Sequence, residues 1–431
     1  MVKIETDKKL TKDKPIEKFV PSLVYIPLIQ HTGKPAKPLV KTDDYVFLGQ
    51  KIAETDALVS ASVHASVSGK VKSIQNYPHP SLGVCEAIVI ENDEKDKTED
   101  KNILSEEEVN KLTSQDLILK IKESGIVGLG GAGFPTHIKL SPPKPIDTLI
   151  INGAECEPYL TGDFRLMVEK TNQIIKGVEL IVKILGVKKV YLAIEDNKPE
   201  AIKAFEKELK ALHITHYTLH ILKSHYPQGA EKQLIKNILK REVPSGKLPF
   251  DVGVVVQNVA TCLAIYEAVY FNKPLYERVV TVTGNCLSHP KNILVRIGTP
   301  IKDLISLCGP LKEKPKKIIF GGPMMGLAQY TEDVPVIKTT TGIVVLGESE
   351  VKVLKEEFCI RCGRCVESCP LGLMPAILSL ASQSQNWELA KEYSIFDCIE
   401  CGLCGYVCPA KRNMVQYIKQ AKLVLLKDER K

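Results

Sequence analysis

A pattern of four cysteines and a proline occurs twice near the end of this chain, and no other feature constrains the fold as strongly. The two copies are Cys359-x-x-Cys362-x-x-Cys365-x-x-x-Cys369-Pro370 and Cys398-x-x-Cys401-x-x-Cys404-x-x-x-Cys408-Pro409. Thiolates at this spacing bind cubane iron–sulfur clusters, and the fourth cysteine of each run ligates the other cluster. We therefore expect two [4Fe-4S] clusters: cluster one on Cys359, Cys362, Cys365 and Cys408, and cluster two on Cys369, Cys398, Cys401 and Cys404.

Two structural zinc sites are the alternative, because paired C-x-x-C units also bind zinc. A zinc site needs four thiolates and has no use for a third cysteine two residues further on, so the repeated pattern favours clusters. The other five cysteines are scattered and odd in number: Cys85, Cys156, Cys262, Cys286 and Cys308. Since clusters require reduced thiols, we expect an intracellular chain in which these five are free.

Length and composition describe an ordinary globular protein of about three domains at ~150 residues each. Of the 431 residues, 44% are hydrophobic and 25% charged. The net charge of +7 comes from interspersed lysines and acids without aromatic-rich basic patches, which argues against nucleic acid as a partner. Residues 1–18 have no apolar stretch, so we expect no signal peptide. The most apolar segment, residues 252–271, is best interpreted as a buried strand followed by a helix.

The pattern along the chain changes several times, which predicts a multidomain fold of α/β and α+β parts. After a charged arm at residues 1–19, short apolar alternations at 20–91 indicate a small β domain. That segment resembles a lipoyl-type barrel-sandwich domain, but Ala57 stands where the family carries its cofactor-bearing lysine. We therefore expect the shared fold without swinging-arm chemistry.

Downstream of a charged linker, residues 109–271 alternate between buried strands and amphipathic helices, which predicts a Rossmann-like, mostly parallel sheet. We expect strands at 148–152, 189–194 and 217–222 and helices at 163–185, 199–212 and 230–241. A small module at residues 279–345 and the cluster domain at 351–431 follow. In the cluster domain we expect one helix at 374–391 and a solvated terminal helix at 413–431, with a docking helix as the alternative for that tail.

A glycine-rich loop lies early in the α/β segment. Gly128, Gly130, Gly131 and Gly133 fit G-x-G-x-x-G, although no strand is expected before them and Phe134-Pro135 follows directly. Four glycines in six residues let backbone N–H groups close around an anion, and Lys139 adds a positive charge nearby. A tight structural turn is the other interpretation of the same glycines.

Four motifs in order resemble the NADH-oxidising, flavin-binding subunit of respiratory complex I. They are Gly128-Leu-Gly-Gly-Ala-Gly-Phe-Pro-Thr-His-Ile-Lys139, Asn152-Gly-Ala-Glu155-Cys-Glu157-Pro158, Tyr226-Pro-Gln-Gly229-Ala-Glu231 and Gln257-Asn258-Val-Ala-Thr261. The resemblance implies non-covalent FMN, with the four loop glycines and Lys139 near its phosphate. It also implies that Phe134 and Glu157 face the nicotinamide nucleotide. Asn152, Glu155, Tyr226, Gly229, Glu231 and Asn258 would surround the rest of the flavin. The chain departs from the family at Leu129 and Ala154, where an arginine and an aspartate are usual.

Over nearly its full length the chain resembles the RnfC family of electron-transport complex components. That family implies a β-grasp module at 279–345 and a two-cluster ferredoxin-type domain at the end. It further implies a peripheral subunit on the cytoplasmic side of a membrane complex that exchanges electrons between ferredoxin and NAD(H). No side chain is expected to act as a nucleophile or strong base, although Glu157 and Glu231 are candidates for orienting roles. Two alternatives remain: a soluble flavin and iron–sulfur reductase of a bound cofactor such as cobalamin, and a non-catalytic iron–sulfur relay.

Overall fold

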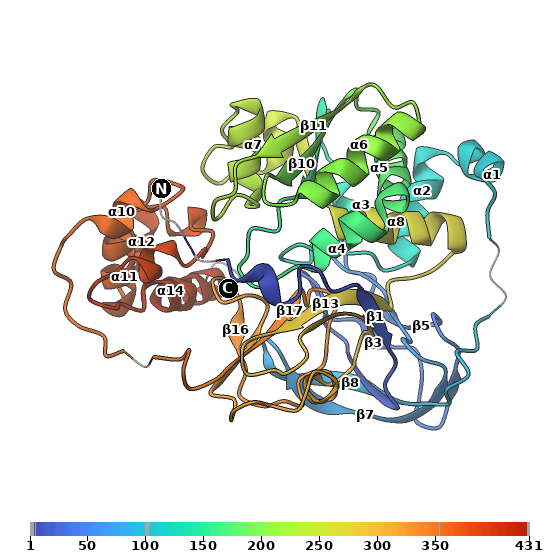
Figure 1. Ribbon diagram of the computed structural model, residues 1–431, viewed down its shortest axis with the longest axis horizontal. Helices are drawn as coiled ribbons and strands as arrows, with labels where there is room; N and C mark the ends of the chain where they lie inside the picture. The colour runs from blue at the N-terminus through green and yellow to red at the C-terminus, as the bar shows by residue number, and fades with distance from the viewer. Residues whose placement is uncertain (1–3, 5, 100–102, 353, 429–431) are drawn as a thin grey trace.

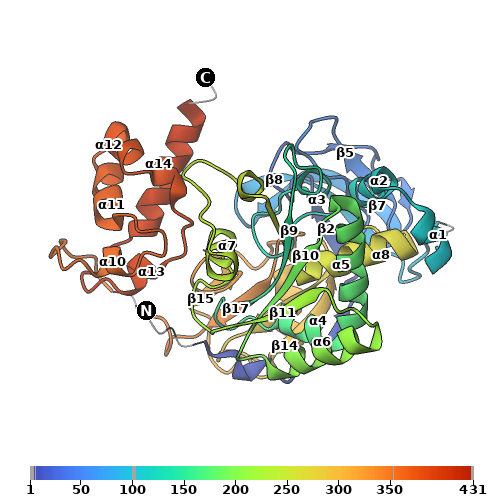
Figure 2. The same cartoon turned by 90° about the horizontal axis from the view of Figure 1, so that it is seen from above.

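The computed structural model describes residues 4, 6–99, 103–352 and 354–428. Within these residues four modules follow one another along the chain, and Figures 1 and 2 show them from two directions. The ends of the predicted arm and of the predicted tail, residues 1–3 and 429–431, lie outside the described residues. Both views place the cluster domain at one end of the molecule, on the side where α7 lies.

The N-terminal module is a barrel-sandwich of two small antiparallel sheets, as the sequence predicts. One sheet has the order β2 (Leu23–Pro27), β8 (Gly83–Asn92), β7 (Gly69–His79) and β4 (Tyr45–Val46), and the other has the order β3 (Lys37–Pro38), β5 (Lys51–Glu54) and β6 (Val63–His64). Ile26 and Ile88 from the first sheet pack with Ile52 and Val63 from the second in one buried core. Alternating apolar residues on each strand supply this core.

The central α/β module has a sheet of four parallel strands, as predicted. Its order is β11 (Tyr217–Leu222), β10 (Lys189–Glu195), β9 (Thr148–Gly153) and β12 (Val254–Asn258). Helices α2 (Ser114–Glu123), α5 (Thr171–Leu185), α6 (Pro199–Ala211) and α8 (Val259–Phe271) pack on one face, and α7 (Glu231–Leu239) packs on the other. The single helix expected at residues 163–185 is wrong. It is two helices, α4 (Gly162–Glu169) and α5, because Lys170 leaves the helical conformation at φ −130°.

The third module is a six-stranded mixed sheet with a covering helix, α9 (Ile301–Leu307). Its order is β1 (Ile16–Phe19), β14 (Lys291–Arg296), β13 (Glu277–Thr283), β17 (Gly342–Leu346), β15 (Lys317–Phe320) and β16 (Leu327–Ala328). The edge strand β1 belongs to the N-terminal arm and pairs with β14 in parallel, Ile16 opposite Asn292. The charged arm is therefore built into this sheet, a non-local pairing that no local pattern announces.

The cluster domain is helical, and two expectations about its helices are wrong. The expected helix at 374–391 is two helices, α11 (Pro375–Gln383) and α12 (Trp387–Glu392), because Gln385 adopts a left-handed φ of 55°. The last helix, α14 (Met414–Asp428), is not simply solvated. Its Ile418 and Leu425 are buried against Leu378 of α11. These residues recur at helical spacing, so they form one apolar stripe.

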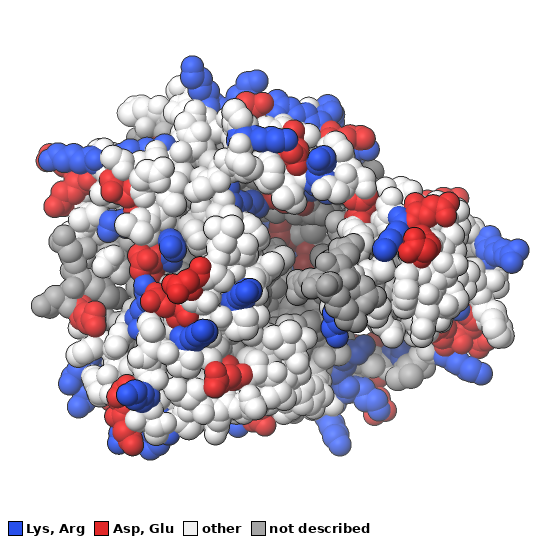
Figure 3. All heavy atoms as spheres, turned by 180° about the vertical axis from the view of Figure 1, so that it is seen from behind, with Lys and Arg blue, Asp and Glu red and all other residues white. Residues whose placement is uncertain are grey.

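Charge and hydropathy of the folded chain agree with the composition. On the face in Figure 3, lysines and arginines lie among aspartates and glutamates rather than in one continuous basic patch. None of the described helices combines the length and the hydropathy that a membrane span requires. All thirteen cysteines are free, and Cys262, Cys286 and Cys308 are buried outside the two cysteine runs.

Candidate functional site

The carboxyl ends of β9 and β12 form the centre of the candidate site. Asn152 and Asn258 lie at the ends of these neighbouring strands, directly opposite each other in the parallel register. The chain order of the sheet reverses between them, because β10 follows β9 on one side while β12 lies on the other. In open α/β sheets ligands bind in the crevice at such a switch point. Both asparagines were predicted site residues, and the fold brings them together.

The glycine loop lies directly beside Asn258. Gly128 N donates to Phe134 O at 2.9 Å, which closes the loop on itself. A Cβ added at Gly130 would stand 2.7 Å from Asn258 Nδ2, whereas one at Gly131 would meet nothing within 4 Å. Glycine at 130 is therefore required by close approach to the strand end. The loop follows α2 and leads into the four-residue α3 (Thr136–Lys139), so it is not the strand–loop–helix of a dinucleotide fingerprint.

Asn258 joins the loop to the start of two helices. Its Oδ1 accepts from Ala260 N at 2.8 Å and so caps α8, and its Nδ2 donates to Asp163 Oδ2 at 2.6 Å. Burial raises the pKa of Asp163 to about 6, and the negative charge of Glu155 acts in the same direction. Sequence reasoning missed Asp163, because nothing near it in sequence marks it as a partner of Asn258.

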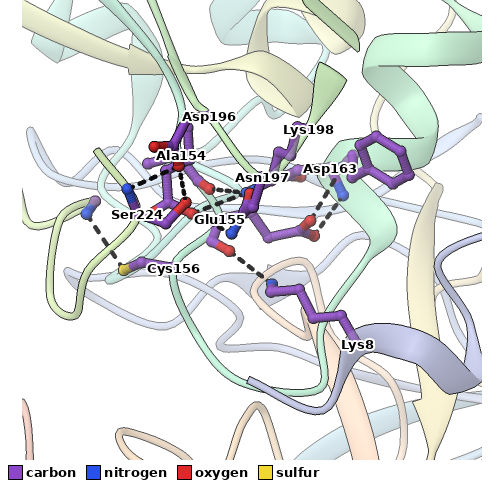
Figure 4. A network of polar contacts seen from close by, with 12 residues as sticks. Lys8, Ala154, Glu155, Cys156, Asp163, Asp196, Asn197, Lys198 and Ser224 are labelled. Carbon is purple, nitrogen blue, oxygen red and sulfur yellow. Dashed lines mark hydrogen bonds and ion pairs between the residues drawn. The ribbon is translucent and has the colours of Figure 1, made fainter. Parts of the chain in front are cut away.

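Residues 154–160, which we call the junction turn, link the end of β9 to α4. Glu155 and Tyr159 in this turn have left-handed φ values of 44° and 69°. The Glu155 carboxylate accepts from Asp163 N at 2.7 Å and from Phe164 N at 3.1 Å, so it caps α4 (Figure 4). Such a carboxylate is favourable at a helix N-terminus, where backbone donors lack partners. Cys156 Sγ accepts from the backbone N of Gly229 at 3.2 Å.

Two lysines hold the junction turn from behind, and sequence reasoning missed both. Lys198 is buried and its Nζ donates to Ala154 O at 2.5 Å and to Glu195 Oε2 at 3.0 Å. Lys8, from the N-terminal arm, reaches Glu155 O at 2.7 Å (Figure 4). Loss of water lowers the pKa of Lys8, and the nearby Glu155 charge partly offsets this. Local sequence gives no signal for either lysine, since both resemble ordinary surface residues.

The third predicted motif completes the site on the side of α7. Asn152 Nδ2 donates to Gly229 O at 2.9 Å, which ties this motif to the end of β9. Glu231 begins α7 and pairs with Lys139 at 2.7 Å between Oε1 and Nζ. Both side chains are partly exposed. The fold therefore brings these four predicted residues to the same side of the sheet end, as two bonded pairs.

Tyr226 and Glu157 face the cluster domain. The Tyr226 hydroxyl donates to the backbone oxygen of Cys401 at 2.7 Å. Glu157 Oε1 accepts from the backbone N of Met324 at 2.7 Å, and burial raises the pKa of its carboxyl. Tyr226, Met324 and Cys401 share one apolar cluster with Cys156. The flavin-type motifs and the second cysteine run are thus in direct contact.

The four cysteines predicted for cluster two line a single cavity: Cys369, Cys398, Cys401 and Cys404. Apolar side chains such as Leu371, Leu378 and Ile418 complete its wall. Burial and the neighbouring thiols raise the pKa of Cys401 to about 11 and that of Cys404 to about 12. Thiolates gathered in such surroundings become favourable around a cationic core, which is what an iron–sulfur cluster supplies. The donor set therefore fits the predicted cluster.

The cysteines predicted for cluster one lie apart from this cavity. Cys365 and Cys408 are buried in an apolar cluster with Met414, while Cys359 is half-buried and Cys362 is exposed. Among the described residues, no group of three or more His, Cys, Asp or Glu is placed to hold a single metal ion. The arrangement gives the zinc alternative no support.

Comparison with known proteins gives four family matches, one for each module. Residues 2–95 match the RnfC barrel sandwich hybrid domain, 121–267 the Nuo51 FMN-binding domain, 279–328 the SLBB domain and 351–409 the 4Fe-4S dicluster domain. Among solved structures, an NAD+-reducing [NiFe]-hydrogenase in the H2-reduced state has a similar fold, with a TM-score of 0.50 at 16% identity. That match covers 73% of this chain and 61% of the hydrogenase chain.

Full-length relatives are more similar, and each is the C component of an ion-translocating complex. That of the proton-translocating ferredoxin:NAD(+) oxidoreductase complex of Clostridium ljungdahlii is 51% identical over 97% of this chain and 92% of its own length. That of the Na(+)-translocating ferredoxin:NAD(+) oxidoreductase complex of Acetobacterium woodii is 44% identical over 95% of this chain and 93% of its own. That of the ion-translocating oxidoreductase complex of Rhodobacter capsulatus is 42% identical over 97% and 81%.

Proposed function

This chain belongs to the RnfC family of ion-translocating ferredoxin:NAD(+) oxidoreductase complexes, and from that premise we propose how its residues divide the work. It is an electron-transfer subunit that works with NAD(H), FMN and two [4Fe-4S] clusters, as part of a membrane-associated complex. The similarity to these relatives and the FMN-binding domain favour this function over a cobalamin reductase and over a plain relay.

FMN is held in the crevice at the carboxyl ends of β9 and β12. The single observation that carries this assignment is the meeting of Asn152, Asn258 and Gly130 at the point where the strand order reverses. The exposed side of the glycine loop, Gly130 and Gly131, takes the phosphate. Lys139 gives that phosphate a cation, and in its absence the ammonium is satisfied by Glu231.

The rest of the flavin lies along the junction turn and the α7 loop. Asn152, Glu155, Tyr226, Gly229, Glu231 and Asn258 line this part, and Gly128 and Gly133 shape the loop beside it. Phe134 is an exposed apolar side chain of the loop and, with Glu157, faces the nicotinamide nucleotide. Burial raises the pKa of Glu157, so its carboxyl can be held in place without a strong local charge.

Cluster two is the cluster nearer the flavin. FMN supplies exchange between hydride pairs and single electrons, and the clusters carry single electrons. The chain's own contribution is to hold the two sites together: Tyr226 bonds the backbone of Cys401, and Met324 packs beside both. Cluster one, whose Cys362 is exposed, is the outer cluster and faces the partner that exchanges electrons with it.

The subunit lies on the cytoplasmic side of the membrane, bound to other subunits of the complex. Its relatives are named for exchange between ferredoxin and NAD(+) coupled to proton or sodium translocation. Ferredoxin and NAD(H) are reactants of the cytoplasm, which supports this side. The electron partner is therefore ferredoxin itself or a ferredoxin-like subunit.

Anaerobic reconstitution tests the assignment. The chain, loaded with iron, sulfide and FMN, is titrated with NADH while flavin and cluster absorbance are followed. We expect NADH to bleach the flavin and then the clusters. In a Cys401→Ala variant the flavin is expected to bleach while cluster reduction is lost or slowed, since cluster two lacks a ligand. If NADH bleaches neither flavin nor clusters in the intact chain, the nucleotide and flavin assignment is wrong.

A further inference from the structure

The N-terminal arm crosses the molecule as a strap between the cluster domain and the six-stranded sheet. Ile4 packs near Tyr226 and Cys401, and Thr6 O accepts from the backbone N of Tyr159 at 2.8 Å. Further along, the backbone oxygen of Thr11 accepts from Asn292 Nδ2 at 2.9 Å, and β1 then pairs with β14. The strap therefore runs directly over the junction turn.

Lys8 is the side chain of this strap that reaches into the turn. Its Nζ donates to the backbone oxygens of Glu155 at 2.7 Å, Glu157 at 2.9 Å and Leu160 at 2.5 Å. An ammonium has three donors, and all three are used on this one short segment. The segment includes the two left-handed residues Glu155 and Tyr159, a shape that costs free energy unless its surroundings hold it.

The junction turn in turn holds three separate parts of the site. Through the Glu155 carboxylate it caps α4, and through Cys156 Sγ it receives the backbone N of Gly229. Through the Glu157 carboxylate it binds Met324 N, in a loop that touches the second cysteine run: a Cβ at Gly402 would lie 2.8 Å from Met324 O. A change in this turn would therefore reach the flavin site and cluster two together.

We propose that Lys8 is a positioning residue of the electron-transfer site: its ammonium fixes the junction turn, and with it the flavin pocket and the approach of cluster two. This rests on the proposed function for the flavin and the clusters. Lys8 acts through the backbone of the turn, which its three hydrogen bonds hold. Its neighbour Lys9 offers a matched comparison, because its side chain is 82% exposed and pairs with Asp7 at 3.8 Å, away from the turn.

Hydrogen–deuterium exchange of the full chain carrying its clusters tests this without relying on FMN. In Lys8→Met we expect amide exchange to accelerate about tenfold at two distant segments, residues 163–164 and 324–325, whose N–H groups are held by Glu155 and Glu157. Exchange in the β7–β8 hairpin should stay unchanged, and Lys9→Met should match the wild type throughout. Acceleration everywhere, or at neither segment, would overturn the proposal.

FMN titration adds the functional readout. Lys8→Met is expected to raise the FMN Kd about tenfold, with Lys8→Arg between it and the wild type because the charge is kept but the fork fits the three oxygens poorly. If Lys8→Met does not fold, Lys8→Arg carries both measurements, and wild-type exchange in it would refute the role. A wild-type chain that binds no FMN would instead defeat the proposed function, while the exchange result would still decide the role of Lys8 in the turn.

Discussion

Adjacent glycines in the loop offer a sharp test of the site, because only one of them is in close contact. Neither Gly130 nor Gly131 has a left-handed φ, so alanine is compatible with the backbone at both. At Gly130 the added Cβ would lie 2.7 Å from Asn258 Nδ2 and 2.9 Å from its Cγ, while at Gly131 it would enter open space. Gly130→Ala must therefore displace Asn258 or the loop, and Gly131→Ala need displace nothing.

The cost of moving Asn258 can be worked from its two bonds. Loss of its cap on α8 costs about 1 kcal/mol, and loss of its bond to the Asp163 carboxylate costs about 1.5–3 kcal/mol. Reduced freedom of the unfolded chain returns about 0.4–1 kcal/mol for any such glycine-to-alanine change. We expect a net destabilisation of about 2 kcal/mol for Gly130→Ala, and a change within about 0.5 kcal/mol for Gly131→Ala.

Denaturant unfolding of the FMN-free chain, followed by a probe in the central module, measures the stability difference. FMN fluorescence quenching measures binding. If half of the loss appears in the flavin site, the Kd of Gly130→Ala rises about five- to tenfold. Equal damage from both substitutions, or none from Gly130→Ala, would show that the close approach of the loop to Asn258 does not exist in solution.

Three further outcomes follow from the same geometry. Cys369→Ala should remove cluster two and spare cluster one, and Cys408→Ala should do the reverse, leaving about four irons in each case; loss of the cluster formed by its own run would refute the crossed ligation. Lys139→Gln should raise the FMN Kd about tenfold in a salt-dependent manner, whereas Lys144→Gln, which breaks a surface pair with Asp251, should not change it. Because the pKa of Asp163 is raised from 3.8 to about 6, its ionisation opposes folding, so stability falls as pH rises through that window. Asp163→Asn should therefore stabilise the FMN-free chain at pH 7.5 and lose this advantage near pH 4; an advantage that does not depend on pH would contradict the burial of that carboxyl.

Strands and ligand-type motifs could be predicted because each is recorded locally. The apolar run at residues 217–222 is β11 without any change of bounds, since buried strands of a parallel sheet are rich in apolar residues along their whole length. Asn152 and Asn258 were found by their motifs, and their meeting follows from the parallel register once both strands are placed. The cysteine pattern likewise singled out the four thiols that line one cavity.

Residues that act through distant backbone could not be found in this way. Lys8 lies 147 positions from Glu155, in a segment whose composition is that of a solvated arm. Asp163 lies 95 positions from Asn258 and resembles any acid in a first helical turn. The missed break at Lys170 and the buried stripe of α14 have the same origin: packing partners in three dimensions override the local helical pattern.

The separation between the proposed flavin site and cluster two is set by segments from all along the chain. Ile4, Cys156, Tyr226, Met324 and Cys401 meet in one apolar cluster, although they come from the arm, the central module, the third module and the cluster domain. Each contact is local and modest, but together they join the two redox sites through packed side chains. An isolated central module would keep the strand ends and the glycine loop, and so the means to bind FMN, yet lack the cysteine runs that bring a cluster near it. One continuous chain is therefore what makes a flavin site into an electron-transfer subunit here, because the strap and the third module supply a fixed separation that a flexible tether between two domains would not.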